Sequence, residues 1–414
     1  MKKLIHVIGG GTFNHVRAHL SLAAPAFGET AEALAALCVE MFDQSMYEVK
    51  LHLTKMADRK SIIVTNDDVA DLIDQLCEDK RTKVIFMNAA LTDFTGAIGN
   101  VESGKHATRL HSREGEKSIA ITPAPKVLTK IRKEGHVRKD IYLVAFKTTC
   151  NASSEDQYRA GLALLKGTSA NLVLANDIGT KHNMIVVPEE AAYHETHNRQ
   201  EVLRNLVDMV KHRSNLHFTK STVVDDVMTP WSSDVVPQSL REVVDHCIKR
   251  GAYKAFDGKT AGHFAVKVGD NKFLTSPRKR NFNDLEAIGL VSVEASDDDM
   301  VVAHGGKPSV GGQSQRIVFA EHEGLDCIVH FHSVRKTDSQ VPVVSQREYE
   351  CGSHECGQNT SRGLREVEEG IHAVYLDNHG PNIVFNRDVP AARVIDFIER
   401  NFNIKEKSGG YEFA

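Results

Sequence analysis

The sequence lacks the features that mark membrane-spanning, secreted and nucleic-acid-binding proteins. No apolar run reaches the roughly 18 residues that a membrane-spanning helix needs. His6 and three glycines interrupt the N-terminal stretch MKKLIHVIGGGT, so we expect no secretory signal there. The net charge is only −4, from 51 basic and 55 acidic residues, which argues against nucleic acid or an anionic membrane as a partner. Seven scattered cysteines without a framework spacing are typical of reduced thiols in a cytoplasmic protein.

The composition is that of an ordinary globular protein of two domains. Hydrophobic residues make up 41% and charged residues 26% of 414 positions, a length that predicts two domains. Pro230 and Pro237 interrupt a polar stretch, after which Ser239 and Glu242 form a capping-box pattern that opens a new helix. We therefore expect an N-terminal domain at 1–215, a linker at 216–237, a second domain at 238–404 and a C-terminal tail at 405–414.

The first half alternates buried-strand patterns with helical patterns. Short apolar runs at 3–8, 83–88, 141–149 and 171–177 are separated by segments such as 28–46, whose apolar residues recur at helical spacing. This alternation predicts an α/β fold with a doubly wound parallel sheet. Ligands of such sheets bind at the carboxyl ends of the strands. Those ends fall at Gly9–Thr12, Asn88–Asp93, Lys147–Asn151 and Asn176–Asp177.

These motifs, in this order, resemble phosphopantothenoylcysteine synthetase, a nucleotide-dependent ligase of coenzyme A biosynthesis with a Rossmann-like fold. The matching stretches are GGGT at 9–12, VR at 16–17, AALTDF at 89–94, VAFKTTCN at 144–151 and LAND at 174–177. The resemblance covers residues 1–215 and implies binding of CTP or ATP with Mg²⁺. It implies these nucleotide-binding residues: Gly9, Gly10, Gly11, Thr12, Ala90, Asp93, Lys105, Phe146, Asn176 and Asp177.

The first half also departs from that family. Ser21 and Leu22 stand where the family has serine and asparagine, and the lysine-rich motif is reduced to Lys105 and Arg109. The resemblance therefore implies nucleotide binding more strongly than the ligase reaction. Alternatively, Asp93, Asn176 and Asp177 do no more than stabilise turns at strand ends.

The second half contains the stretch CIVHFHS at 327–333. Alternate side chains of a strand face the same way, so His330 and His332 are expected on one face and Phe331 on the other. Paired imidazoles of this kind suit a metal ion. A histidine pair can also arise by chance in a chain with 21 histidines.

The surrounding motifs resemble the class II aldolase/adducin family over residues 238–404. They are TAGH at 260–263, TSPR at 275–278, PSVGG at 308–312, IVHFHS at 328–333 and LDNHG at 376–380. The resemblance implies an α/β/α domain that binds Zn²⁺ or another divalent metal through His330, His332 and His379. It implies a homo-oligomer, a tetramer or a dimer. The residues implied to hold a substrate phosphate or carboxylate are Thr260, Gly262, His263, Thr275, Ser276, Arg278 and Ser309.

The glutamate that serves the family as general acid and base is missing. Counting back 19 residues from His330 leads to Gly311, which has no proton to exchange. Glu321 and Glu323 lie nearer in sequence but in what looks like an exposed helix end. Routine aldol cleavage is therefore in doubt, and the catalytic residues stay unassigned.

Three functions remain open from the sequence. We favour a two-domain metabolic enzyme whose zinc domain performs lyase, epimerase or dehydratase chemistry on a small phosphorylated or nucleotide-linked metabolite. The first alternative is a nucleotide-dependent carboxylate–amine ligase with a non-catalytic aldolase-like domain. The second is a non-enzymatic assembly or ligand-sensing protein.

Overall fold

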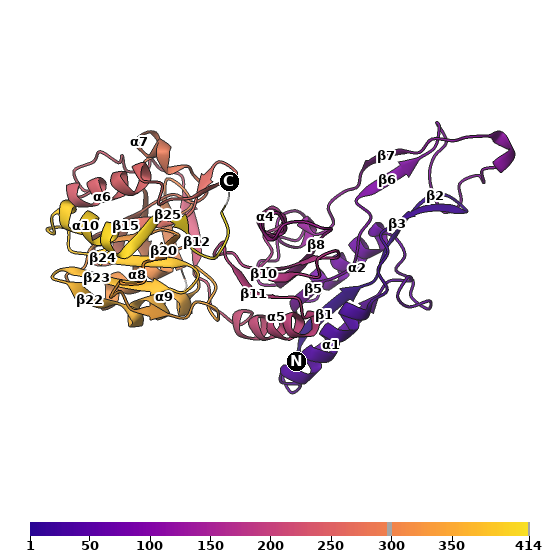
Figure 1. The fold of residues 1–414 in the computed structure, drawn as a ribbon, viewed down its shortest axis with the longest axis horizontal. Coiled ribbons are helices and arrows are strands. Elements are labelled where there is room, and N and C mark those ends of the chain that lie inside the picture. The colour runs from indigo at the N-terminus through magenta and orange to yellow at the C-terminus, as the bar shows by residue number, and fades with distance from the viewer. Residues whose placement is uncertain (296–299, 413–414) are drawn as a thin grey trace. The chain divides into compact units, whose positions relative to one another are not determined.

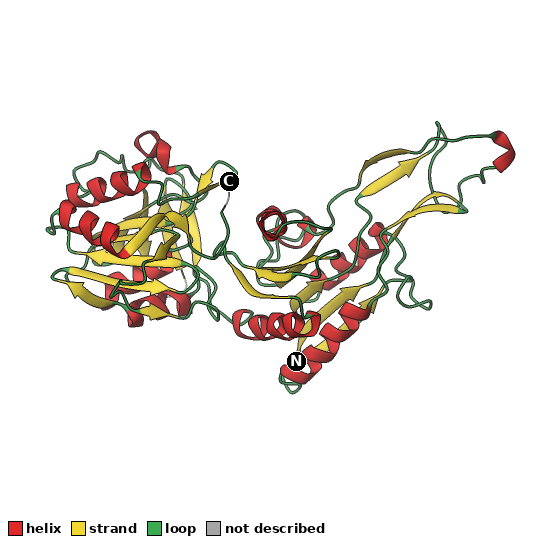
Figure 2. Ribbon diagram, in the orientation of Figure 1, coloured by secondary structure: helices red, strands yellow, loops and turns green. Residues whose placement is uncertain are grey.

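The computed structural model describes residues 1–295 and 300–412, which form two compact units. The first unit consists of residues 1–187 and 194–214, and the second of residues 188–193 and 215–414. In Figure 1 the first unit is indigo to magenta and most of the second is orange to yellow. Figure 2 shows that both units mix helices with strands.

The first unit is built on a seven-stranded sheet with the order β11-β10-β9-β8-β5-β1-β4. Strands β4, β1, β5, β8 and β9 are parallel neighbours, and β10 is antiparallel to β9. Numbered along the chain, the parallel strands have the order 2-1-3-4-5, which confirms the predicted doubly wound sheet. The strands are β1 (Lys3–Gly9), β4 (Tyr47–Leu53), β5 (Thr82–Met87), β8 (Tyr142–Thr149), β9 (Leu172–Asp177), β10 (Asn183–Val186) and β11 (Ala192–Thr196).

Helices pack on both faces of this sheet. Helices α1 (Glu29–Met41) and α5 (Arg199–Arg213) contact each other, whereas α3 (Thr129–Arg132) contacts α2 (Asn66–Glu78) and α4 (Ser154–Thr168). Outside the main sheet, the first unit also has two two-stranded ribbons and a short helix. They comprise β2 (Phe13–Arg17), β3 (Leu20–Ala23), β6 (Phe94–Ala97), β7 (Ala120–Pro123) and η1 (Ser112–Glu114).

The second unit is an α/β/α sandwich, as predicted. Helices α6 (Gln238–Lys249) and α10 (Ala391–Asn401) pack together over one core, and α8 (Gly312–Glu321) and α9 (His354–Gly363) contact each other. The main sheet comprises β12 (Lys220–Val224), β18 (Met300–His304), β17 (Val291–Ala295), β16 (Lys272–Thr275), β15 (His263–Gly269), β19 (Cys327–His330), β24 (Gly380–Phe385), β23 (Ile371–Leu376), β21 (Val343–Val344) and β22 (Arg365–Glu368). The smaller elements are β13 (Ala255–Phe256), β14 (Lys259–Thr260), η2 (Phe282–Asp284), α7 (Leu285–Ile288), β20 (Ser333–Arg335) and β25 (Phe402–Lys407).

The expected linker and the expected C-terminal tail are both folded parts of the second unit. Within the expected linker 216–237, β12 pairs with β18 and forms an edge of the main sheet, and Trp231 is buried in the core at 1% exposure. Pro230 and Pro237 both follow β12, and Pro237 is the N-cap of α6, so neither proline prevents that strand from pairing or Trp231 from being buried. In the expected tail 405–414, β25 pairs with β20, and Lys407 is buried. Within the described ranges, no helix has both the length and the apolar character to cross a membrane.

Candidate functional site

Three histidines converge in the second unit. His330 is the last residue of β19, His332 follows two positions later, and His379 directly precedes β24. Their candidate ligand atoms lie within 4.8 Å of one another, and none of the three residues is more than 6% exposed. Phe331 faces the other way, into the core beneath α6 and α10. The structure thus brings together the three residues that the sequence motifs single out.

Hydrogen bonding and burial set the state of His330. Its Nδ1 lies 2.8 Å from the carbonyl oxygen of Pro381, so that Nδ1 carries the hydrogen and donates it. Its Nε2 lies 3.3 Å from Nε2 of His379. Burial, together with the neighbouring imidazoles, holds the pKa of His330 well below its usual value. His330 is therefore a neutral imidazole whose free nitrogen faces the centre of the cluster, as metal binding requires.

An acidic residue that the sequence motifs missed also contacts the cluster. Glu190 belongs to the segment 188–193, which groups with the second unit. Its Oε2 lies 3.3 Å from Nδ1 of His332, and both side chains are buried. No spacing rule could have found it, because the contact joins residues far apart in the sequence and Glu190 lies outside the motifs. Glu321, by contrast, accepts a hydrogen bond from Ser361.

The turns expected to hold an anion are adjacent to each other. The main chain of Arg278 donates to Lys307, and that of Ser309 donates to Ser276, at 2.9 and 3.1 Å. His263 lies opposite His330 in the β15–β19 ladder, and their rings stack at 4.8 Å. Gly262 has φ +104°, and a Cβ there would lie 2.5 Å from the His330 carbonyl oxygen. The turns are therefore fastened directly to the histidine cluster.

Several hydroxyl groups of these turns are already used within the fold. Thr275 donates to the carbonyl of Phe264, and Ser276 accepts from its amide, both at 3.4 Å. Thr260 donates to the carbonyl of Arg280 at 3.1 Å. Ser309 accepts from the amide of Gly311 at 3.3 Å. The amides of Arg278 and Ser309 are also used within the fold, so the exposed side chain of Arg278 is better placed to meet an anion than these hydroxyl groups.

The space of the missing glutamate is filled by His263. A Cβ at Gly311 would lie 2.1 Å from Cδ2 of His263, so no side chain fits there beside the ring. Nδ1 of His263 is 2.8 Å from Nε2 of Gln315. Burial, and secondarily His332, lowers the pKa of His263 to about 3. The pair replaces a carboxylate with a buried neutral imidazole.

Asn382 adds a further polar group that the motifs did not indicate. It lies opposite His330 in the β19–β24 ladder, so the two side chains share one face of the sheet. Asn382 is 1% exposed, and its Oδ1 has no hydrogen-bond partner among the described residues. A buried amide oxygen of this kind is costly unless something binds it.

In the first unit, the ends of β1 and β5 meet, as expected at the switch point of the sheet. The amide of Ala90 donates to Gly10, and the amide of Thr12 donates to Ala90, at 2.9 and 3.0 Å. The glycines pack against protein, however: a Cβ at Gly9 would lie 2.1 Å from Cβ of Ala31. A Cβ at Gly11 would lie 2.0 Å from the carbonyl oxygen of Ala24. Close chain packing therefore explains Gly9 and Gly11 without a phosphate.

The remaining candidates of the first unit are scattered over the same edge. Asp177 accepts hydrogen bonds from the main chain of Thr180, Ala152 and Asn151, which hold its pKa well below its usual value. Because these amides already bind its carboxylate, Asp177 is better explained as a residue that stabilises a turn than as one that binds a nucleotide. Asp93 is exposed and pairs with Lys126 at 2.9 Å. Lys105 is exposed, and Phe146 and Asn176 are half-buried.

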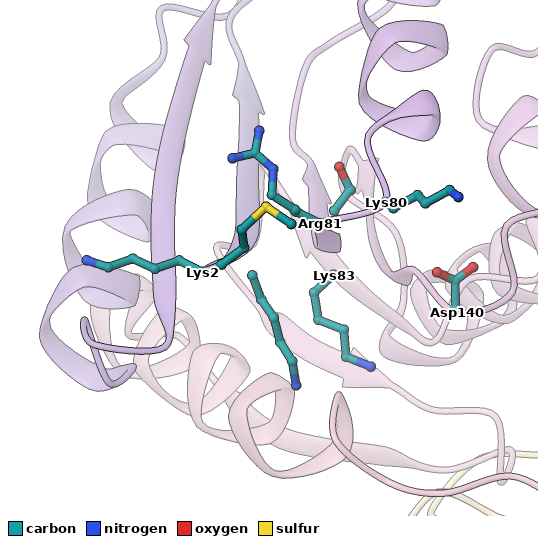
Figure 3. Close-up of a pocket in the computed structure, with 8 residues that line it drawn as sticks. Lys2, Lys80, Arg81, Lys83 and Asp140 are labelled. Carbon is teal, nitrogen blue, oxygen red and sulfur yellow. The ribbon is translucent and has the colours of Figure 1, made fainter.

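A basic hollow lies at the other end of the first unit's strands. It has a volume of about 260 Å³ and lies where β1 and β5 begin, away from the glycine turn. Figure 3 shows Lys2, Lys80, Arg81 and Lys83 around it, with Asp140. Arg81 already pairs with Asp79 at 2.6 Å. The hollow is therefore separate from the edge where doubly wound sheets bind ligands.

Comparison with solved structures finds likenesses to each half of the chain. The DNA/pantothenate metabolism flavoprotein of Streptococcus pneumoniae is 16% identical, covering 51% of this chain and 99% of that one, with a TM-score of 0.42. The C-terminal domain of the coenzyme A biosynthesis bifunctional protein CoaBC is 15% identical, covering 50% and 94%, with a TM-score of 0.37. L-fuculose 1-phosphate aldolase is 19% identical, covering 41% and 83%, with a TM-score of 0.31. These are likenesses of fold at low identity.

Sequence comparison gives a result for the second half. No curated protein sequence matches the chain significantly. A family model does match, over most of the second unit and over all three histidines of the cluster. Residues 241–403 match the class II aldolase and adducin N-terminal domain, which confirms the resemblance that the motifs of the second half predicted.

Proposed function

We propose that the second unit binds one divalent metal ion, zinc or another, and performs lyase, epimerase or dehydratase chemistry on a small phosphorylated or nucleotide-linked metabolite. The observation that carries the proposal is the convergence of His330, His332 and His379 in a buried site. Three neutral imidazoles are a typical catalytic zinc set, which leaves a coordination position for substrate.

The residues present fit such an ion. The tautomer of His330 is fixed with Nε2 towards the cluster, and Asn382 offers a buried oxygen on the same face. A bound divalent cation would polarise a carbonyl or hydroxyl oxygen of the substrate. The guanidinium group of the exposed Arg278, in the turn that is joined to residues 307–309, would hold the anionic end of the substrate.

The chemistry differs from that expected of a site with a glutamate at position 311. His263 occupies that space, and its lowered pKa keeps it neutral at physiological pH. A buried neutral imidazole can accept or donate a hydrogen bond but carries no charge to a substrate. The general acid or base of the proposed reaction would therefore come from a residue other than position 311.

The test is the metal content of protein purified without chelator, measured beside His330→Ala. About one equivalent of metal per chain, lost in the variant, supports the proposal. The absence of bound metal even after addition of Zn²⁺, Mn²⁺ and Fe²⁺ contradicts it. His354→Ala is the matched control, because His354 contacts Arg316 and Gln358.

A second candidate is a nucleotide-dependent ligase in the first unit. It is favoured by the 2-1-3-4-5 strand order, which places Gly10, Thr12 and Ala90 at the switch point. Calorimetric titration with CTP and ATP in Mg²⁺, followed by a pyrophosphate-release assay, tests it. Failure of every nucleotide and sugar phosphate to bind would instead favour an assembly or ligand-sensing role. We further propose a cytoplasmic homo-oligomer, a tetramer or a dimer.

A further inference from the structure

The segment 188–193, here called the strap, brings a carboxylate to the histidine cluster. It precedes the rest of the second unit in the chain and lies outside the family match at 241–403. Glu190 of the strap approaches His332 to 3.3 Å, with side-chain exposures of 6% and 7%. The cluster therefore acquires a buried acidic neighbour from outside the motifs that define it.

The strap is held in place around Glu190. Oε1 of Glu189 accepts from the amide of Cys351 at 2.6 Å. The ammonium group of Lys407 donates to the main-chain oxygen of Glu190. Glu190 itself has φ +62°, a strained conformation for a residue other than glycine that persists only when its surroundings enforce it. These contacts aim the carboxylate at His332 rather than leave it free to reach solvent.

Residues 407–408, near the C-terminus, also support His379. Ser408, next to Lys407, donates to the main-chain oxygen of His379 at 2.5 Å. The hydroxyl of Tyr193, at the end of the strap, donates to the carbonyl of Asp377 at 3.3 Å. The strap and residues 407–408 thus form one support around two of the three imidazoles.

The geometry assigns Glu190 a role that rests on the proposed metal site. We propose that Glu190 is a positioning residue whose buried carboxylate attracts the Nδ1 edge of His332, at 3.3 Å in an electrostatic contact rather than a hydrogen bond, and so turns its Nε2 towards a divalent cation. At His330 the corresponding nitrogen, Nδ1, is held by a hydrogen bond to the carbonyl of Pro381. A carboxylate also makes the imidazole a stronger ligand, and loss of such a partner commonly weakens metal binding by about 10- to 100-fold.

The alternative is an ion pair that does no more than fasten the strap. The two roles differ in what a substitution at Glu190 changes. A fastening ion pair affects the stability of the metal-free protein and leaves the intrinsic affinity for metal alone. A positioning carboxylate affects the affinity and the geometry of the bound ion.

The experiment measures Zn²⁺ affinity of the full chain by competition with a chromogenic chelator. The variants are Glu190→Ala, Glu190→Gln and Glu190→Asp, with Glu189→Gln as the control from the same strap. The Co²⁺ forms are compared by absorption spectroscopy, and the chelator-treated proteins by thermal unfolding. We expect Glu190→Ala to lose about 10- to 100-fold in affinity. Glu190→Gln should lose less, because the partial negative charge of its amide oxygen can still attract Nδ1 of His332, and Glu190→Asp should recover part of the loss.

The outcomes separate this inference from the function on which it rests. In one outcome, Glu190→Ala binds Zn²⁺ with wild-type affinity, shows an unchanged Co²⁺ spectrum and is less stable than the wild type without metal. This outcome would show an ion pair that only fastens the strap, and it would overturn the role of Glu190 but not the proposed metal site. If Glu189→Gln lost as much Zn²⁺ affinity as Glu190→Ala, the role of Glu190 would also be overturned, because the loss would then come from a disturbed strap. Failure of the wild type to bind Zn²⁺ or Co²⁺ would overturn both.

Discussion

The imidazole ring of His263 leaves no room for a side chain at Gly311. A Cβ at Gly311 would overlap the His263 ring at 2.1 Å, although Gly311 has φ −68°, which any residue adopts. The need for glycine is therefore steric and comes from one side chain. The side chain that position 311 can carry therefore depends on the residue at position 263.

The first prediction concerns this pair. Gly311→Ala should destabilise the second unit by about 1–3 kcal/mol, because the added methyl group forces the imidazole from its place. His263→Asn should remove most of that penalty, so that the double variant is more stable than the sum of the single effects. Urea unfolding of the four proteins measures the coupling. Additive effects would show that the overlap is relieved elsewhere.

The second prediction concerns metal and stability. Adding Zn²⁺ to chelator-treated protein should stabilise the second unit by about 2.7 kcal/mol at a free concentration 100 times the Kd. The chain's single tryptophan, Trp231, is buried in this unit and reports its unfolding by fluorescence. The shift should vanish in His379→Ala. His354→Ala should keep it, and an equal loss in both variants would argue against a specific site.

The third prediction concerns acid sensitivity of the first unit. Burial, and then the neighbouring His52, lowers the pKa of His6 to about 4 from 6.5. The unfolded state then binds the proton more readily, so stability is lost as the pH falls from about 6.5 towards 4. The slope from this group reaches about 1.4 kcal/mol per pH unit. His6→Gln should flatten it in urea unfolding at pH 7, 6 and 5, whereas His19→Gln, at an exposed histidine, should not.

The fourth prediction concerns Asp177. Its pKa is depressed in the folded state, so its contribution is complete above about pH 4 and is lost as the pH falls through the folded pKa. Asp177→Asn should speed hydrogen exchange of the amides of Ala152 and Thr180 at pH 7. Asp93→Asn, which breaks an exposed ion pair, should not. Slowed or unchanged exchange in Asp177→Asn would mean that the amides are held by other contacts.

Much of the fold follows from local patterns. Alternating strand and helix periods predict the parallel sheet, and Ser153 caps α4 through the amide of Asp156, as its side chain suggests. The histidine pair was predicted from strand geometry, although β19 ends at His330 and His332 lies just beyond it. Proline and polar composition misdirected the expectation for 216–237, because a segment without a buried strand pattern can still add an edge strand.

The sequence by itself determined the two α/β units and, through family motifs, the three histidines, because side-chain periodicity and short motifs are local. Only the tertiary structure decided what surrounds them. Glu190 reaches His332, and His263 takes the space above Gly311, through contacts between residues distant in the chain. Such contacts depend on how strands and loops pack in three dimensions, and no period or spacing along a single chain encodes them.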